Sequence, residues 1–138
     1  MIFAGAVPKD VKAEVTIDFY GDAQSSDAGI LFRTTGASIG YDAQRGYFAG
    51  LIPRTQLVIL GRTDGSTWRE LARAKTKIDT GRSQQLTIEA QEDRITVWHD
   101  GAQKIRHTDN TYDRGSIGLR VVNADASFSQ LEVTGISE

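Results

Sequence analysis

The sequence contains no cysteine. This absence excludes a disulfide framework, a thiol nucleophile and any zinc or iron–sulfur site that thiolates would hold. With two prolines and no low-complexity run, the chain is also neither a proline-rich linker nor a collagen-like fibre. The glycine-rich dinucleotide-binding motif, the P-loop, the HExxH zinc motif and the EF-hand pattern are all missing. The absence of these motifs removes most of the support for a cofactor-dependent enzyme, and we expect no cofactor.

Charge of one sign is not gathered into a block of the sequence. Sixteen basic residues stand against eighteen acidic ones, for a formal net charge of -2, so we expect no nucleic-acid partner. The segment before Lys9 is too short for the apolar part of a signal peptide, and no apolar run approaches the ~18 residues of a membrane span. We therefore expect no membrane association, and a role outside the cell only as a module of a larger protein.

What the sequence does contain is typical of one folded domain. Its 138 residues are 39% hydrophobic and 25% charged, enough apolar surface for a core. We predict a single domain over residues 1–138, and a monomer.

Short alternating segments dominate the chain. In Val11–Tyr20 the apolar residues occupy every second position, which is the pattern of a half-buried strand. Asp100-Gly101 is a strong signal for a two-residue hairpin turn, and Pro53-Arg54 separates two further strands. About nine such strands predict an all-β, antiparallel β-sandwich or jelly roll. Further strands are expected at Gly29–Thr34, Gly46–Ile52, Gln56–Arg62, Gln84–Gln91, Arg94–His99, Gly115–Asn123 and Ser127–Thr134.

The segment Thr67–Lys77 is ambiguous. Thr67 and Glu70 fit a helix capping box, and Trp68, Leu71 and Ala72 have helical spacing. Its place between two strand segments favours strand or loop, and the helix stays open as an alternative.

The two histidines do not form a site. A two-residue turn at Asp100-Gly101 pairs His99 with Ala102 and Arg94 with His107, so the imidazoles would not face each other. We expect no two-histidine metal centre and no histidine-based nucleophilic triad.

Polar and aromatic residues gather in two loops, Gly40–Tyr47 and Thr108–Gly115. Carboxylates and guanidiniums can each bind two vicinal sugar hydroxyls, and an aromatic ring can carry the C–H face of a sugar. Ordinary turn residues and solvated charges are the alternative. Arg33 and Arg120 each end an apolar strand motif and are expected to project from the face opposite the core, beneath these loops. The candidate carbohydrate-binding residues are Asp42, Arg45, Tyr47, Asp113, Arg114, Arg33, Arg120 and Tyr112.

Trp68 and Trp98 are the other aromatic candidates. Trp98 alternates away from its apolar neighbours, and we expect it to pack in a core on the second face of its sheet. Trp68 follows a turn and is the better candidate for an exposed platform, with a core position as the alternative.

The order of several motifs resembles concanavalin A-like, laminin-G-like jelly rolls, and most closely the family 66 carbohydrate-binding modules of fructan hydrolases. The resemblance spans about residues 10–136 and implies a non-catalytic module that binds the terminal fructose of levan-type fructans, secreted as part of a larger hydrolase. These modules often begin with a further strand, for which only Met1–Asp10 is available here. The motifs are Asp27-Ala-Gly-Ile-Leu-Phe-Arg33, Gly46-Tyr-Phe-Ala-Gly-Leu51, Val58-Ile-Leu-Gly61, Trp68-Arg-Glu-Leu71, Tyr112-Asp-Arg-Gly-Ser-Ile-Gly-Leu-Arg120 and Ala126-Ser-Phe128.

Three functions follow from this reading. The leading one is the sugar-binding module, which needs no catalytic acid or base. A small jelly-roll glycoside hydrolase, similar to 3-keto-disaccharide hydrolases, would need two carboxylates across a cleft. The third is a laminin-G-like interaction domain, with a structural calcium ion held by Asp27, Asp109 or Asp113.

Overall fold

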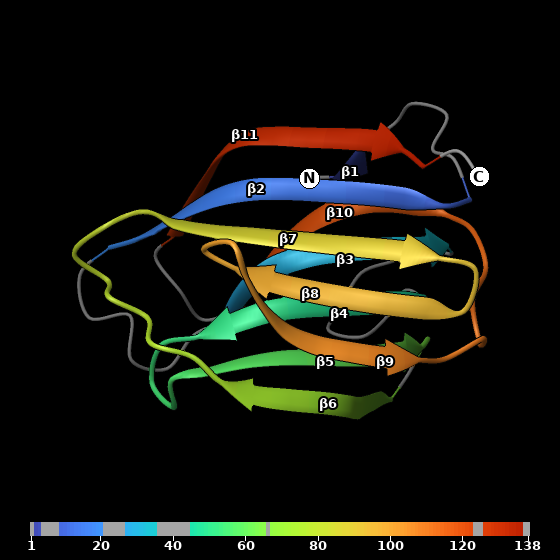
Figure 1. Cartoon of the computed structure of the whole chain (residues 1–138), viewed down its shortest axis with the longest axis horizontal. Coiled ribbons are helices and arrows are strands. Elements are labelled where there is room, and N and C mark those ends of the chain that lie inside the picture. Colours follow the sequence, from blue (N-terminus) through green and yellow to red (C-terminus); the bar gives the residue numbers. More distant parts are fainter. Residues whose placement is uncertain are drawn as a thin grey trace.

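The strands expected from the alternating segments are present in the computed structural model of the chain (Figure 1). The structure describes residues 2–3, 9–20, 27–35, 45–65, 67–122 and 126–136. Every regular element in these ranges is a strand: β1 Ile2–Phe3, β2 Val11–Phe19, β3 Asp27–Thr35, β4 Arg45–Ile52, β5 Leu57–Asp64, β6 Trp68–Lys75, β7 Gln84–Gln91, β8 Arg94–His99, β9 Ala102–Thr108, β10 Ser116–Val122 and β11 Ala126–Gly135.

The strands form two antiparallel sheets that stack face to face (Figure 1). The six-stranded sheet has the order β1-β10-β3-β4-β5-β6, and the five-stranded sheet has the order β11-β2-β7-β8-β9. The predicted all-β sandwich is therefore confirmed. Among the described residues, no helix is long and apolar enough to cross a membrane.

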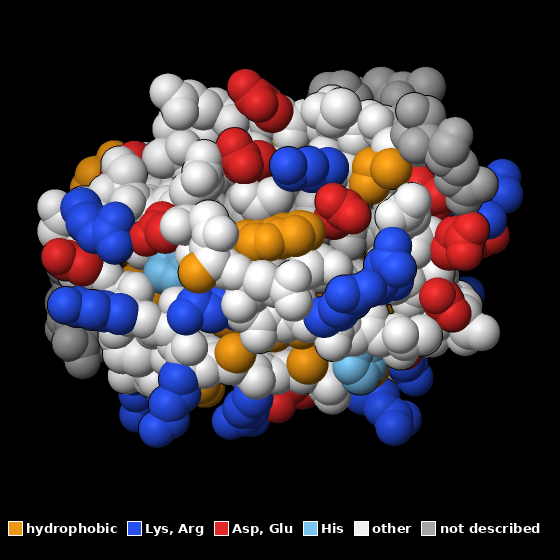
Figure 2. Space-filling model, viewed as in Figure 1, with side chains coloured by type: hydrophobic (Ala, Val, Ile, Leu, Met, Phe, Trp, Pro, Cys, Tyr) orange, Lys and Arg blue, Asp and Glu red, His pale blue; other side chains and the backbone are white. Residues whose placement is uncertain are grey.

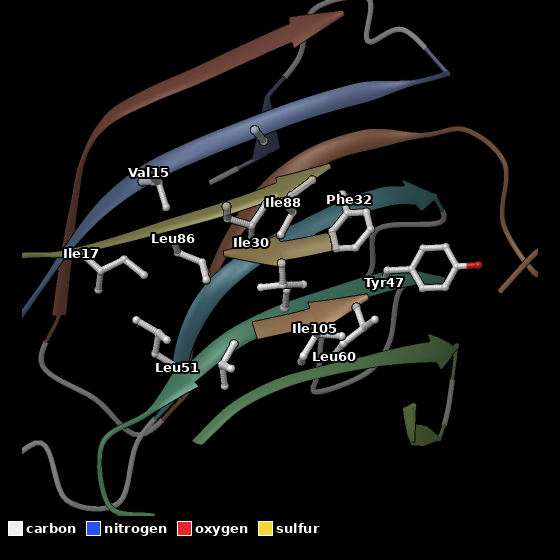
Figure 3. Close-up of a cluster of buried hydrophobic side chains, with 14 of the residues drawn as sticks. Val15, Ile17, Ile30, Phe32, Tyr47, Leu51, Leu60, Leu86, Ile88 and Ile105 are labelled. Carbon is white, nitrogen blue, oxygen red and sulfur yellow. The ribbon is translucent and has the colours of Figure 1, made fainter. Parts of the chain in front are cut away.

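The core lies between the sheets and follows from the alternation. On β2, Val11, Val15 and Ile17 are completely buried, and their neighbours in sequence are more exposed. Side chains from both sheets interlock here, and Tyr47 stands at one end of the cluster with its hydroxyl pointing away from it (Figure 3). This end of the sandwich is where the loop after β9 lies.

Both predicted hairpins are confirmed. Strands β4 and β5 pair around residues 53–56, and β8 and β9 pair around Asp100-Gly101. Asp100 and Gly101 have φ of 50° and 82°, the two positive values that a type I′ turn requires.

The segment Thr67–Lys77 is a strand for most of its length, β6, with a bulge. Leu60 pairs with Ala72 but Gly61 pairs with Glu70, so Leu71 is an extra residue. Leu71 and Ala72 both pack against the core. The extra residue breaks the two-residue period, and this produces the spacing that resembled a helix.

A second bulge corrects the histidine pairing. His99 pairs with Ala102 as predicted, but His107 pairs with Ile95 and not with Arg94. The register shifts by one because Lys104 is the extra residue between the Trp98–Gln103 and Val97–Ile105 pairs. The two histidines still do not face each other.

The N-terminal strand that the resemblance calls for is short. Strand β1 consists of two residues, and Ile2 and Phe3 pair with Gly118 and Ile117 of β10. It covers the edge of the six-stranded sheet.

Candidate functional site

A third bulge directs the Arg33 side chain toward the interior at the end of the sandwich. Strand β3 pairs regularly with β4 up to Phe32–Tyr47, and the register then shifts before Thr35–Arg45. Arg33 has a φ of 50° at this bulge, and the backbone of Gly115 lies against it so closely that a Cβ there would approach Thr34 N within 2.5 Å. The predicted outward direction of Arg33 is therefore wrong, because the bulge re-aims its side chain.

The Arg33 guanidinium joins three separate segments and is 1% exposed. It donates to the carbonyl oxygens of Lys9 (3.1 and 3.2 Å), Glu92 (2.7 Å) and Tyr112 (3.4 Å), and to Asp10 Oδ1 (3.3 Å). Burial lowers the pKa of Arg33, and the charge of Asp10 opposes this shift. With these bonds made, Arg33 organises the surface above it and has little capacity left for a ligand.

The loop after β9 is fixed by Asp109. Its carboxylate accepts hydrogen bonds from the Tyr47 hydroxyl (2.5 Å) and Thr111 N (3.0 Å), and pairs with Arg62 (2.5 Å). Burial alone would raise the pKa of Asp109, but the hydrogen bonds of Tyr47 and Thr111 outweigh it and the net shift is downward. Burial, followed by the bond to Asp109, raises the pKa of Tyr47 to about 12. Tyr47 is thus a buried anchor, with none of its surface open to a sugar.

Above Arg33 lies an open hollow of about 610 Å³ at the end of the sandwich, the end pocket. Tyr112 lines it, but its hydroxyl already donates to Thr63 O (2.6 Å). Asp10 is likewise engaged, by Arg33 and by Glu92 N (3.0 Å). The lining residues are Lys9, Asp10, Glu92, Asp93, Asn110, Tyr112, Asp113 and Ile136.

A second hollow, of about 180 Å³, lies on the outer face of the six-stranded sheet, the sheet-face hollow. Its lining residues are Asp27, Phe48, Ile59, Trp68 and Arg120. The Trp68 ring meets Phe48 edge to face, with ring centroids 6.1 Å apart, and the Arg120 guanidinium carbon lies 5.0 Å from the centre of the Phe48 ring. This hollow combines aromatic rings, a guanidinium and a carboxylate.

Local sequence explains why the aromatic rings can lie on this face. Phe48 and Gly61 are cross-strand partners, and a Cβ on Gly61 would collide with the Trp68 ring. Glycine therefore leaves the space into which Trp68 settles. Phe48 is 1% exposed although it points away from the main core, because Trp68, Leu31 and Ile59 pack around it.

The structure separates the eight residues predicted to form one site. Tyr112 and Asp113 line the end pocket above Arg33, whereas Arg120 lies on the outer sheet face as expected. Arg45 is exposed at the start of β4 and lines neither hollow, and Tyr47 is buried. Arg114 is exposed, and its Nε lies 3.6 Å from Oδ1 of Asp113. Asp42 lies outside the described residues.

Sequence reasoning missed Asp27 and Phe48 as companions of Arg120, and left Trp68 undecided. Their motifs were visible, but the common face depends on cross-strand pairing, with Asp27 opposite Val122 and Phe48 opposite Gly61. Trp98 is half-buried on the outer face of the five-stranded sheet, between buried Val97 and His99. It does not enter a second core there, because no element among the described residues covers that face.

The candidate calcium ligands do not come together. Asp27 is at the first residue of β3 and lines the sheet-face hollow, whereas Asp109 is at the other end of the sandwich, against Tyr47. Among the described residues, no three His, Asp or Glu side chains are grouped to hold a metal ion.

Comparisons with solved structures identify the fold. A carbohydrate binding module, CBM66, from Bacillus subtilis superimposes with a TM-score of 0.80 and is 26% identical, over 94% of this chain and 77% of that chain. Sheep galectin-11 superimposes with a TM-score of 0.72 over 97% of this chain and 96% of its own, at 10% identity. The predicted jelly-roll fold is confirmed.

Sequence comparison gives two further findings. A levanase of Bacillus subtilis (strain 168) is 30% identical over 90 residues, which cover 65% of this chain and only 13% of the levanase. The model of the 3-keto-alpha-glucoside-1,2-lyase-like domain family matches residues 2–134. Since that match covers nearly the whole chain, the chain belongs to the 3-keto-alpha-glucoside-1,2-lyase-like domain family.

Proposed function

We propose that the protein is a non-catalytic carbohydrate-binding module that holds the terminal fructose residue of levan-type fructans. The similarity to a carbohydrate binding module and to part of a levanase supports this proposal. The observation that carries it is the sheet-face hollow, where Trp68 and Phe48 stand beside Arg120 and Asp27.

The chemistry of the hollow suits a sugar ring. Half-buried Trp68 offers an apolar surface to ring C–H groups, while the Arg120 guanidinium carries hydrogen-bond donors and the Asp27 carboxylate carries acceptors of the kind that sugar hydroxyls use. Its ~180 Å³ is smaller than the roughly 300–1,000 Å³ of pockets for drug-sized ligands. We therefore assign it one sugar ring at a chain end, with the rest of the polymer outside.

The end pocket supports sugar binding less well. Arg33 already donates hydrogen bonds to backbone carbonyl oxygens, and the Tyr112 hydroxyl already donates to Thr63 O. The acidic side chains that remain at its rim can accept from hydroxyls, and half-buried Tyr112 is the aromatic residue that lines it. Asp113 is the residue that tests whether this pocket contributes.

The similarity to part of a levanase supports the proposal that the chain belongs to a larger protein. The chain matches a stretch that is 13% of the levanase's length. We propose that this protein is likewise a module of a secreted hydrolase, which it brings to its polysaccharide.

Calorimetry with levan oligosaccharides tests the site by comparing two tryptophan variants, one in the hollow and one on the other sheet. Trp68→Ala removes the platform and should weaken binding at least tenfold, whereas Trp98→Ala on the opposite sheet should leave it within twofold. Arg120→Gln should weaken binding about tenfold, since a hydrogen bond with a charged partner contributes ~1.5–3 kcal/mol. Folding of each variant is checked by its melting temperature. Full affinity in both Trp68→Ala and Arg120→Gln would reject the sheet-face hollow, and a loss confined to Asp113→Ala would move the site to the end pocket.

Catalysis is the second candidate function, because the family is named for a lyase and Asp10, Glu92, Asp93 and Asp113 converge on the end pocket. Glycoside cleavage by paired carboxylates needs them about 5–10 Å apart across the bond. The purified chain is incubated with levan and with a 3-keto-glucoside, and product release is measured. Turnover that disappears in Asp113→Asn or Glu92→Gln would establish an enzyme, and no turnover alongside binding supports the module.

A further inference from the structure

Positive charge is concentrated along the margin that β6 and β9 form. Six of the sixteen basic residues lie on β6, β9 or just after β6, and Glu70 is the only acidic residue in the stretches 68–78 and 102–108. Lys and Arg side chains gather along the lower margin of the molecule in Figure 2, where Figure 1 places β6 and β9, and the acidic side chains lie mainly above. The six residues are Arg69, Arg73, Lys75, Lys77, Lys104 and Arg106.

Three of these side chains converge on one hollow of about 390 Å³, the lysine hollow. Lys75 and Lys77 flank Thr76 on one side, and Lys104 comes from the bulge of β9 on the other. Within the described part of the chain, no carboxylate lies within ion-pair distance of the three ammonium groups, whereas nearby Arg73 pairs with Glu70 at 2.8 Å. Like charges brought together without a counter-charge repel one another, which disfavours this arrangement in the absence of an anion.

Two of the three polar residues in the remaining wall of the hollow, Gln56 and Thr76, are already hydrogen-bonded within the protein. Gln56 Nε2 donates to Pro53 O (2.8 Å) and Ile78 O (3.1 Å), and Gln56 Oε1 accepts a hydrogen bond from Ile78 N (2.7 Å). The Thr76 hydroxyl is bonded to His99 Nδ1. These bonds hold Gln56 and Thr76 in place, so the three ammonium groups are the main donors facing the hollow, and their combined charge favours an anionic ligand over a neutral one.

We propose that the lysine hollow binds carboxylate groups of an acidic polysaccharide. A single-stranded nucleic acid is disfavoured, since such strands are held by stacking on aromatic side chains and the hollow is lined by Thr55, Gln56, Thr76 and the three lysines. The carboxylate groups of a uronic acid polymer can accept hydrogen bonds from the lysine ammonium groups without a stacking platform. This site is independent of the sheet-face hollow and of the fructan it is proposed to bind.

Calorimetry with polygalacturonate oligosaccharides tests the proposal at low salt and at about 0.5 M salt. Lys104→Gln and Lys77→Gln should each weaken binding at least fivefold. Lys12→Gln removes the same charge from an exposed position on β2 and should leave binding within twofold. Salt should weaken binding by the wild type more than tenfold, because exposed charges are screened over about 10 Å at 0.1 M and about 3 Å at 1 M.

Four outcomes would overturn the proposal: no binding by the wild type, full affinity in both hollow variants, an equal loss in Lys12→Gln, or tighter binding of an oligothymidylate of equal charge. The melting temperature of Lys104→Gln shows whether it folds, and Lys77→Gln on another segment serves if it does not. Levan affinity separates the two sites. Lys104→Gln should keep it, and Trp68→Ala should keep polygalacturonate affinity.

Discussion

At the scale of single residues, Arg33 shows that a buried charge can serve the fold and leave a ligand site to others. The five hydrogen bonds that it donates to described residues tie residues 9–10, the β7–β8 turn and the loop after β9 to the end of β3. Arg120 ends a similar motif but lies over an aromatic ring on the open face of the sheet. Two arginines that look alike in sequence therefore have opposite roles, because one follows a bulge.

Arg33→Met should destabilise the protein by ~3–5 kcal/mol, because Asp10, whose side chain is only 12% exposed, would lose its charged partner and three carbonyl oxygens would lose their donor. Urea unfolding followed by far-UV circular dichroism measures the change. Arg114→Met is the control, since Arg114 is exposed and should change stability by no more than ~0.5 kcal/mol. A loss below about 1 kcal/mol in Arg33→Met would show that the guanidinium is dispensable for the fold.

His99 is a second buried residue whose partners fix its state. Gln84 Nε2 donates to Asp79 O (2.6 Å) and Arg82 O (3.1 Å), so Gln84 Oε1 faces His99 Nε2 (2.6 Å) and accepts a hydrogen bond from its N–H group. His99 Nδ1 is then left to accept from the Thr76 hydroxyl. Burial lowers the pKa of His99 below 6.5, with Asp100 opposing and Lys104 and Arg82 adding to the shift.

Stability should therefore fall as the pH drops below about 6.5, because the unfolded chain takes up a proton on His99 that the folded chain resists. Above that pH both states are neutral at this residue and its contribution is fully present. Urea midpoints measured between pH 4.5 and 8 should show the fall, and His99→Gln should flatten it. His107→Gln should leave the slope unchanged, and an equally steep slope in His99→Gln would assign it to carboxylates instead.

At the scale of elements, the places where sequence reasoning failed are bulges. Alternation or short apolar runs between turn signals located β2 through β5, β7, β8, β10 and β11, and the Asp100-Gly101 turn implied β9. In β2 the buried positions recur every second residue, whereas in β3 and β4 they are consecutive. A bulge adds one residue to one strand only, and nothing in the local sequence marks it. Leu71, Lys104 and Arg33 each lie at such a position. The register at Lys104 and the side-chain direction at Arg33 were predicted wrongly. At Leu71 the bulge produced a helical spacing, but strand or loop was favoured there and a strand is present.

The sheet-face hollow could not be assembled from sequence for a related reason. Trp68, Phe48 and Arg120 lie on β6, β4 and β10, and they share a face only because the pairing places all three on the outer side. Residue types identified the chemistry, and Arg120 was chosen correctly as outward-facing. The neighbours of a residue across a sheet depend on strand order, which the alternation does not encode.

Gly61→Ala tests how far one position shapes this face. The added Cβ would collide with the Trp68 ring, so the ring must move off β5, and overpacking of this kind costs ~1–3 kcal/mol. We expect a lower melting temperature together with weaker levan binding. In a Trp98→Phe background, Trp68 is the only tryptophan, and its fluorescence maximum should shift to longer wavelength as it becomes exposed. Gly81→Ala at an exposed turn is the control, and an unchanged spectrum in Gly61→Ala would contradict the packing argument.

At the scale of the whole molecule, different faces of one small sandwich carry different chemistry. The outer face of the six-stranded sheet holds aromatic rings with Arg120, the end above Arg33 is rich in carboxylates, and the β6–β9 margin is cationic. The net charge of -2 conceals this separation, since both signs are abundant and nearly balanced. That is why the composition argued against a nucleic-acid partner, while the arrangement of the lysines favours a different polyanion.

The distance between the carboxylates decides whether they can hold a calcium ion together. Asp109 is saturated by Tyr47, Thr111 and Arg62, and Asp27 belongs to the opposite end of β3, so these carboxylates cannot share one ion. We expect EDTA to leave the melting temperature and the levan affinity unchanged. A bound calcium ion would reveal itself, because at 100 times its Kd it would stabilise the fold by about 2.7 kcal/mol. For a domain of this size that is a rise of roughly 5–20 °C in melting temperature. A calcium titration that raises the melting temperature of the wild type, and does so less in Asp113→Asn, would place an ion at the end pocket.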